Sequence, residues 1–249
     1  MTSLPARPST ASAAFNWSLY ADATFAGLSV LVPVPFLDSA FEWFFKRRVA
    51  GAIAGWRGRR LDPAVLHELN RDAGSWVEGC LMLPITLTWG LLKRLSRKLL
   101  YFLTIKEAID HLSLHWHRAF LLDYALQQGH LDTLGQAQVA RQALDYTLAT
   151  ATTSPLEQLA QRLIPHTRHI TRSLRRARRG EEDEVIRTQR NMMAKAWAGF
   201  AEYLADVAFR YDRAFAQWRA ERAQRAAVAA AEAAAQAELK ENADASHEH

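Results

Sequence analysis

Apolar residues recur along this chain at the spacing of an α-helix, and the pattern is most regular toward the C-terminus. There the apolar positions lie three or four residues apart, which predicts one long helix over residues 184–240 with a continuous seam. The seam residues are Trp197, Phe200, Leu204, Val207, Tyr211, Phe215 and Trp218. They form either the core of the protein or an interface between copies of the chain, because both arrangements bury the same side chains.

Alanine dominates from Ala226 onward, so this part has high helix propensity but few large side chains to bury. We expect an exposed helical extension that projects from the body. Such an extension favours a homo-oligomer or another protein partner. Residues 241–249 are predicted to be a disordered tail.

Local start and stop signals predict the upstream helices. An apolar stretch broken by two prolines precedes the first of them, and Asp62 with Pro63 is a strong start signal for the second. Helices are expected over residues 38–56, 62–71, 105–128 and 132–150, and from residue 154 onward. No segment shows the alternation of a strand.

These segments predict an all-α fold, a single bundle of six or seven helices with a long C-terminal amphipathic helix. We expect residues 1–15 to be a disordered leader. Residues 16–104 form an apolar and basic helical region that is a candidate for membrane contact, and residues 105–240 form the remaining bundle and the long helix. The composition, 49% hydrophobic and 23% charged, supports a sizeable core and argues against wholesale disorder.

Two uncharged apolar blocks, residues 23–37 and 79–92, are each followed by a basic cluster. Neither block reaches the roughly 20 apolar residues of a membrane-spanning helix. Tryptophan and cationic side chains beside apolar segments are typical of contact with the membrane–water interface. The sequence therefore predicts binding to an anionic membrane surface. In the alternative interpretation, both blocks are core helices and the basic residues lie at their solvated ends.

The candidate lipid-binding residues belong to these two regions. They are Trp43, Phe44, Phe45, Lys46, Arg47, Arg48, Trp76, Trp89, Lys93, Arg94, Arg97 and Lys98. The first basic cluster continues with Arg57, Arg59 and Arg60.

A third basic group precedes the acidic run at residues 181–184. Because arginine matches the geometry of phosphate, its members are candidate phosphate-binding residues: Arg172, Arg175, Arg176, Arg178 and Arg179. Nucleic acid is disfavoured as a partner, since the acids cancel local charge and no aromatic side chain interleaves the run. A simpler interpretation is that the cations end one helix and the acids begin the next, where each complements the helix dipole.

His111 and His115 are four residues apart and share one face of a predicted helix, the spacing of a weak metal-binding alternative. A third ligand would have to come from His166 or His169. Hydrogen-bonded or solvated histidines on a bundle helix are the simpler interpretation. No cofactor is expected, and Cys80 is read as a small buried side chain.

The chain carries no glycine-rich nucleotide motif, no nucleophile elbow, no H-E-x-x-H and no Glu-x-x-His pair. These absences lower the expectation of an enzyme without excluding one. The sequence predicts a non-enzymatic helical scaffold or adaptor, cytoplasmic and peripheral to or partly embedded in a membrane. The alternatives are a soluble self-assembling bundle that acts as a protein-interaction module and, third, a metal-dependent enzyme.

Overall fold

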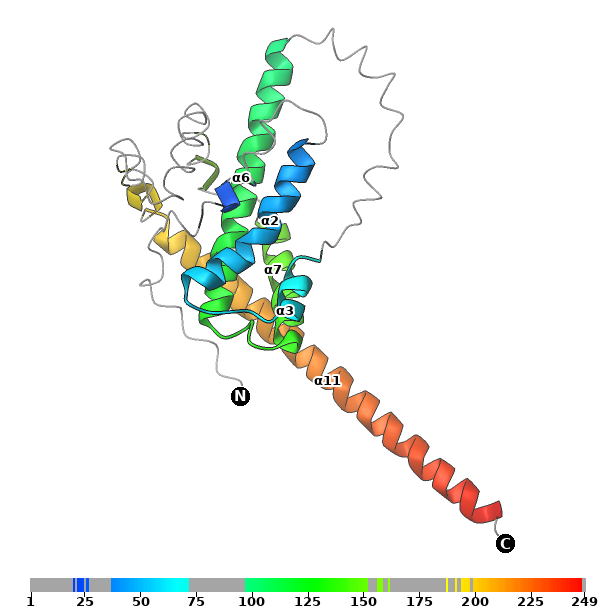
Figure 1. The fold of residues 1–249 in the computed structure, drawn as a ribbon. Helices are drawn as coiled ribbons and strands as arrows, with labels where there is room; N and C mark the ends of the chain where they lie inside the picture. Colours follow the sequence, from blue (N-terminus) through cyan, green and yellow to red (C-terminus); the bar gives the residue numbers. More distant parts are fainter. Residues whose placement is uncertain are drawn as a thin grey trace, which may run out of the picture.

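The computed structural model describes three long stretches, residues 37–71, 97–151 and 199–247, and shorter pieces at 20, 22–24, 26, 156–158, 161, 187, 191 and 194–197. Within these residues the regular structure is helical and there is no strand, so the predicted all-α fold is confirmed. Figure 1 labels α2 (Leu37–Trp56), α3 (Pro63–Leu69), α6 (Arg97–Gln127), α7 (Leu134–Thr150) and α11 (Ala201–His247).

The end of α2 and the start of α3 coincide with signals in the local sequence. Gly58, with a φ of 67°, closes α2, and the Arg59 amide donates to the carbonyl of Ala54 at 2.8 Å. The Asp62 carboxylate then accepts a hydrogen bond from the Ala64 amide at 2.7 Å and caps α3. Both predicted helices are confirmed.

Helix α6 is longer than predicted, because it begins at Arg97 rather than near residue 105. Residues 97–104 contain no proline or glycine that would stop a helix there. The helix therefore crosses the boundary predicted between the two regions of the chain. Gly129, with a φ of 74°, follows its end, and the Thr133 hydroxyl accepts from the Gln136 amide at 3.3 Å to start α7.

The C-terminal helix begins later than predicted. Gly199 and Phe200 form a turn and α11 starts at Ala201, so an uninterrupted helix over residues 184–240 is wrong. The Phe200 amide donates to the Trp197 carbonyl at 2.9 Å, three residues back, which tightens the chain into this turn. Glycine is also costly inside a helix, because it loses the most backbone freedom on folding.

At its other end α11 continues to His247, through most of the segment for which the sequence predicts a disordered tail. Figure 1 shows the outer part of α11 projecting away from the other helices. The side chains of residues 222–237 are exposed. This arrangement agrees with the exposed extension that the alanine-rich sequence predicts.

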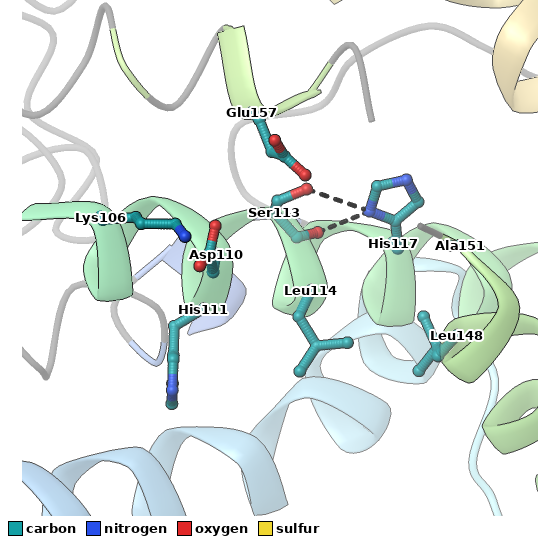
Figure 2. A pocket seen from close by; sticks show the side chains of 9 residues that line it. All are labelled: Lys106, Asp110, His111, Ser113, Leu114, His117, Leu148, Ala151 and Glu157. Carbon is teal, nitrogen blue, oxygen red and sulfur yellow. Dashed lines mark hydrogen bonds between the residues drawn. The ribbon is translucent and has the colours of Figure 1, made fainter. Parts of the chain in front are cut away.

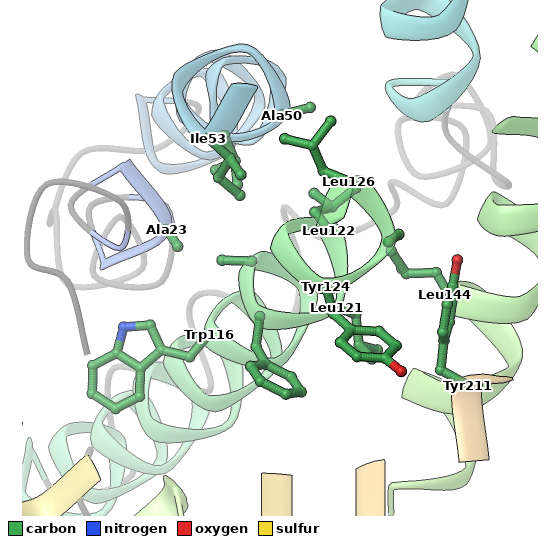
Figure 3. Packing of buried hydrophobic residues seen from close by; sticks show 14 of the residues in the cluster. Ala23, Ala50, Ile53, Trp116, Leu121, Leu122, Tyr124, Leu126, Leu144 and Tyr211 are labelled. Carbon is green, nitrogen blue, oxygen red and sulfur yellow. The ribbon is translucent and has the colours of Figure 1, made fainter. Parts of the chain in front are cut away.

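One hydrophobic core joins α2, α3, α6, α7 and the first part of α11. Helix α6 lies in the middle, and all its residues from 119 to 126 are buried. Figure 3 shows Ala50 and Ile53 of α2 facing Leu122 and Leu126 of α6. In the described residues, the regions predicted as 16–104 and 105–240 thus share a single core.

The predicted C-terminal seam belongs to this core. Its buried members are Trp197, Leu204, Val207, Tyr211 and Phe215, and Phe200 and Trp218 pack against them while partly buried. The Trp197 ring centre lies 4.7 Å from that of Tyr20 and 6.3 Å from that of Trp116. The indole nitrogen of Trp116 donates to the Thr24 hydroxyl at 3.0 Å, which ties the N-terminal segment to α6.

Candidate functional site

Helix α2 presents one face to the core and the opposite face to solvent. Its inner face is formed by Val49, Ala50, Ile53 and Ala54, all buried. Its outer face is formed by exposed or partly exposed residues at helical spacing: Phe44, Arg47, Arg48, Gly51 and Gly55. A methyl group added to either glycine would meet no atom within 4 Å, so there is room at these two positions.

An aromatic and cationic cluster lies on the outer face in the middle of α2. The Phe44 side chain is 45% exposed, and the Arg48 guanidinium lies 5.2 Å from the centre of its ring. The Phe45 ring meets that of Phe44 edge to face at 5.3 Å. Arg48 is also 3.8 Å from the carboxylate of Asp22, and this carboxylate is buried whereas Arg48 is 40% exposed. The structure therefore brings together these members of the predicted lipid-binding set.

In the later part of the first basic cluster, Arg57 and Arg59 bind groups of the helical bundle. Arg57 donates to both oxygens of Asp123 on α6 at 2.8 and 2.7 Å. Arg59 donates to the Leu126 carbonyl at 2.8 Å and also pairs with Asp132. Because Asp123 is buried, its charge requires such a partner.

Trp56 ends α2 with 48% of its surface exposed, and the Arg57 guanidinium covers its ring at 5.0 Å. By helical spacing Trp56 lies about a third of a turn around α2 from Phe44, so it is exposed at the end of α2 rather than on the outer face. In contrast to the exposed residues of α2, the start of the first apolar block is buried: Ala23 and Ala26 have no exposed surface. The core interpretation holds for these residues.

The remaining candidates are only partly covered by the structure. Trp43 lies in α2, and Arg97 and Lys98 lie in the first turn of α6. Lys46 is half-buried and Arg47 is exposed. Other predicted residues lie outside the described part of the chain: Trp76, Trp89, Lys93, Arg94, Arg172, Arg175, Arg176, Arg178 and Arg179.

The histidine pair is placed as its spacing predicts, with the ring centres of His111 and His115 6.3 Å apart on α6. Within the residues that the structure describes, no group of three or more histidine, cysteine, aspartate or glutamate side chains gathers as a metal site. The candidate third ligands, His166 and His169, lie outside those residues.

A pocket of about 480 Å³ with both polar and apolar walls lies along α6 (Figure 2). Its lining residues are Lys106, Asp110, His111, Ser113, Leu114, His117, Leu148, Ala151 and Glu157. Within it, His117 Nδ1 is 2.7 Å from the Ser113 carbonyl oxygen, and Nε2 is 2.7 Å from the Tyr203 hydroxyl. Because a carbonyl only accepts, Nδ1 carries the proton and Tyr203 donates to Nε2. Burial lowers the pKa of His117, and the Ser113 hydrogen bond opposes that effect. Both ring nitrogens are engaged, so this imidazole links α6 to α11.

Several polar pairs inside the bundle were not identified from the sequence. Arg141 of α7 donates to Glu68 of α3 at 2.8 Å, and the Tyr124 hydroxyl donates to Asp212 at 2.6 Å. The partners are 73 and 88 residues apart, so no local motif connects them. A charged residue between apolar neighbours, such as Glu68 between Leu66 and Leu69, was the one sequence signal that a buried charge needs a partner.

Within the described ranges, no helix combines the length and apolar character needed to cross a bilayer. Comparison with known protein families, with curated proteins and with solved structures gives no match to this chain. The function is therefore argued from the residues and their arrangement alone.

Proposed function

We propose that this protein is a non-enzymatic, membrane-associated helical scaffold whose α2 contacts an anionic lipid surface. The observation that carries the proposal is the outer face of α2, where exposed Phe44 stands beside Arg47 and Arg48. Aromatic and cationic side chains together suit the boundary between lipid headgroups and acyl chains. Because the inner face packs α2 against the core, the outer face lies at the surface of the protein.

The electrostatic part of this contact has a definite size. A basic residue near an anionic membrane contributes about 1 kcal/mol. Removing Arg47 and Arg48 therefore costs about 2 kcal/mol, a factor of about 30 in affinity. Reversal to glutamate adds repulsion and increases the loss. Exposed Phe44 contributes further by leaving water.

The test measures binding of the full chain to vesicles of phosphatidylcholine alone and of phosphatidylcholine with phosphatidylserine. We expect binding to the anionic vesicles, weakened by salt because charges at a surface are screened. The variant Arg47→Glu with Arg48→Glu is expected to lose at least a factor of about 30 in affinity.

A matched control carries Arg210→Glu and Arg213→Glu, the same change of net charge on exposed positions of α11. It should keep most of the anionic-vesicle binding. An equal loss in both variants would show that total charge, not the outer face of α2, governs binding. Failure of the unmodified chain to bind any vesicle would remove the proposal.

A further inference from the structure

The outer part of α11 is a long helix whose described side chains, at 222–237, are exposed. The Arg222 guanidinium donates to the Gly135 carbonyl at 3.2 Å where α11 leaves the body. From there to His247 the helix runs for about 39 Å at 1.5 Å per residue. Its side chains at 222–237 are exposed all round, Val228 by 52%. Figure 1 shows this segment standing clear of the bundle.

The outer segment of α11 carries opposite charges at its two ends. Residues 219–225 contain three arginines and one glutamate, while residues 238–244 contain three acids and one lysine. Between them, nine of the twelve residues at 226–237 are alanine. A second copy of the helix placed antiparallel meets the basic end with its acidic end, whereas a parallel copy places like charges together. The antiparallel arrangement also opposes the two helix dipoles.

The positions between the charged ends fit one antiparallel register. Alanines alternate at spacings of three and four along one helix face: Ala223, Ala226, Ala230, Ala233 and Ala237. With the two helices centred between residues 231 and 232, Ala226 of one copy lies opposite Ala237 of the other. The same register places Arg219 opposite Asp244, so the charge match and the spacing agree.

The body supplies additional surface at the end of this pair. Leu134, the first residue of α7, is 43% exposed and precedes the glycine whose carbonyl binds Arg222. In the stated register, residue 241 of the partner helix lies opposite Arg222, which binds the residue next to this leucine. We infer that two copies of this chain associate through antiparallel pairing of the outer part of α11. This inference does not rest on the proposed lipid contact.

The experiment measures the mass of the full chain in solution, without lipid, by size-exclusion chromatography with light scattering. One variant reverses the acidic end (Glu238→Lys, Glu241→Lys and Asp244→Lys). The other reverses the basic end (Arg219→Glu, Arg222→Glu and Arg225→Glu). We expect the unmodified chain to be dimeric, each variant alone to be monomeric, and an equimolar mixture of the two to be dimeric again. Restoration in the mixture shows that both variants are folded.

Orientation is tested by disulfide formation in a Cys80→Ser background. Ala226→Cys mixed with Ala237→Cys should form mixed disulfides, and Ala226→Cys alone should form few. Disulfides formed mainly by Ala226→Cys alone would show parallel pairing and overturn the inference. A monomeric unmodified chain, or variants that dimerise as the unmodified chain does, would also overturn it. Loss of vesicle binding with the dimer intact concerns only the proposed function.

Discussion

The ion pair that fastens α3 to α7 supports a quantitative stability prediction. Arg141 Nε lies 2.8 Å from Glu68 Oε1, and the two side chains are only 13% and 6% exposed. Arg71 lies 3.2 Å from the other Glu68 oxygen, but it is 57% exposed. Arg141→Ala therefore leaves a buried carboxylate with one largely solvated partner.

Removing one member of a buried pair costs about 3–5 kcal/mol, because the remaining charge keeps its desolvation penalty. Since Arg71 retains part of the compensation, we expect about 3 kcal/mol for Arg141→Ala. In a chain of this size that loss lowers the unfolding midpoint by roughly 6–12 °C. Combining Glu68→Met with Arg141→Met replaces the pair by apolar side chains and should recover at least half of the loss, because no buried charge remains.

Thermal and urea unfolding, followed by far-ultraviolet circular dichroism, measures these differences. The control is Arg210→Ala, which removes an exposed pair with Asp206 on α11 and should change stability by less than about 1 kcal/mol. The reasoning is refuted if Arg141→Ala costs no more than this control. It is also refuted if the double methionine variant is less stable than Arg141→Ala.

Three further predictions concern other named contacts. Asp123→Ala should lower the free energy of unfolding in urea by about 2 kcal/mol, because it removes the bidentate partner of Arg57. An unchanged free energy of unfolding would show that this ion pair does not stabilise the fold. Gly129→Ala should destabilise the protein by about 1 kcal/mol because φ is positive at this position. Gly51→Ala lies inside a helix with room for the methyl group and should stabilise the protein by roughly 0.5–1 kcal/mol. Equal effects of the two substitutions would contradict the positive φ of Gly129. Burial lowers the pKa of His130 to about 4 from 6.5, with Arg219 adding to the effect, so the unfolded chain binds the proton first as pH falls. The stability held by neutral His130 is full above pH 6.5 and is lost as pH falls toward 4, and the drop in unfolding midpoint should shrink in His130→Gln.

The sequence by itself determined the elements whose signals act within a few residues. Asp62 and Pro63 start α3, and a glycine with positive φ follows α6, as the sequence indicates. The all-α class and the apolar seam at Tyr211 and Phe215 also follow from helical spacing. Hydrogen bonds of one helical turn and the burial of one face are local properties, so local patterns reveal them.

The tertiary structure decided which members of a local cluster serve the fold. Arg47 and Arg57 belong to the same basic run, but Arg57 finds a buried carboxylate 66 residues away while Arg47 stays on an exposed face. The turn at Gly199 likewise accompanies the packing of Trp197 against Tyr20 and Trp116. Such outcomes depend on the free energy of pairing and packing between distant segments, and that energy exists only once the helices are placed side by side.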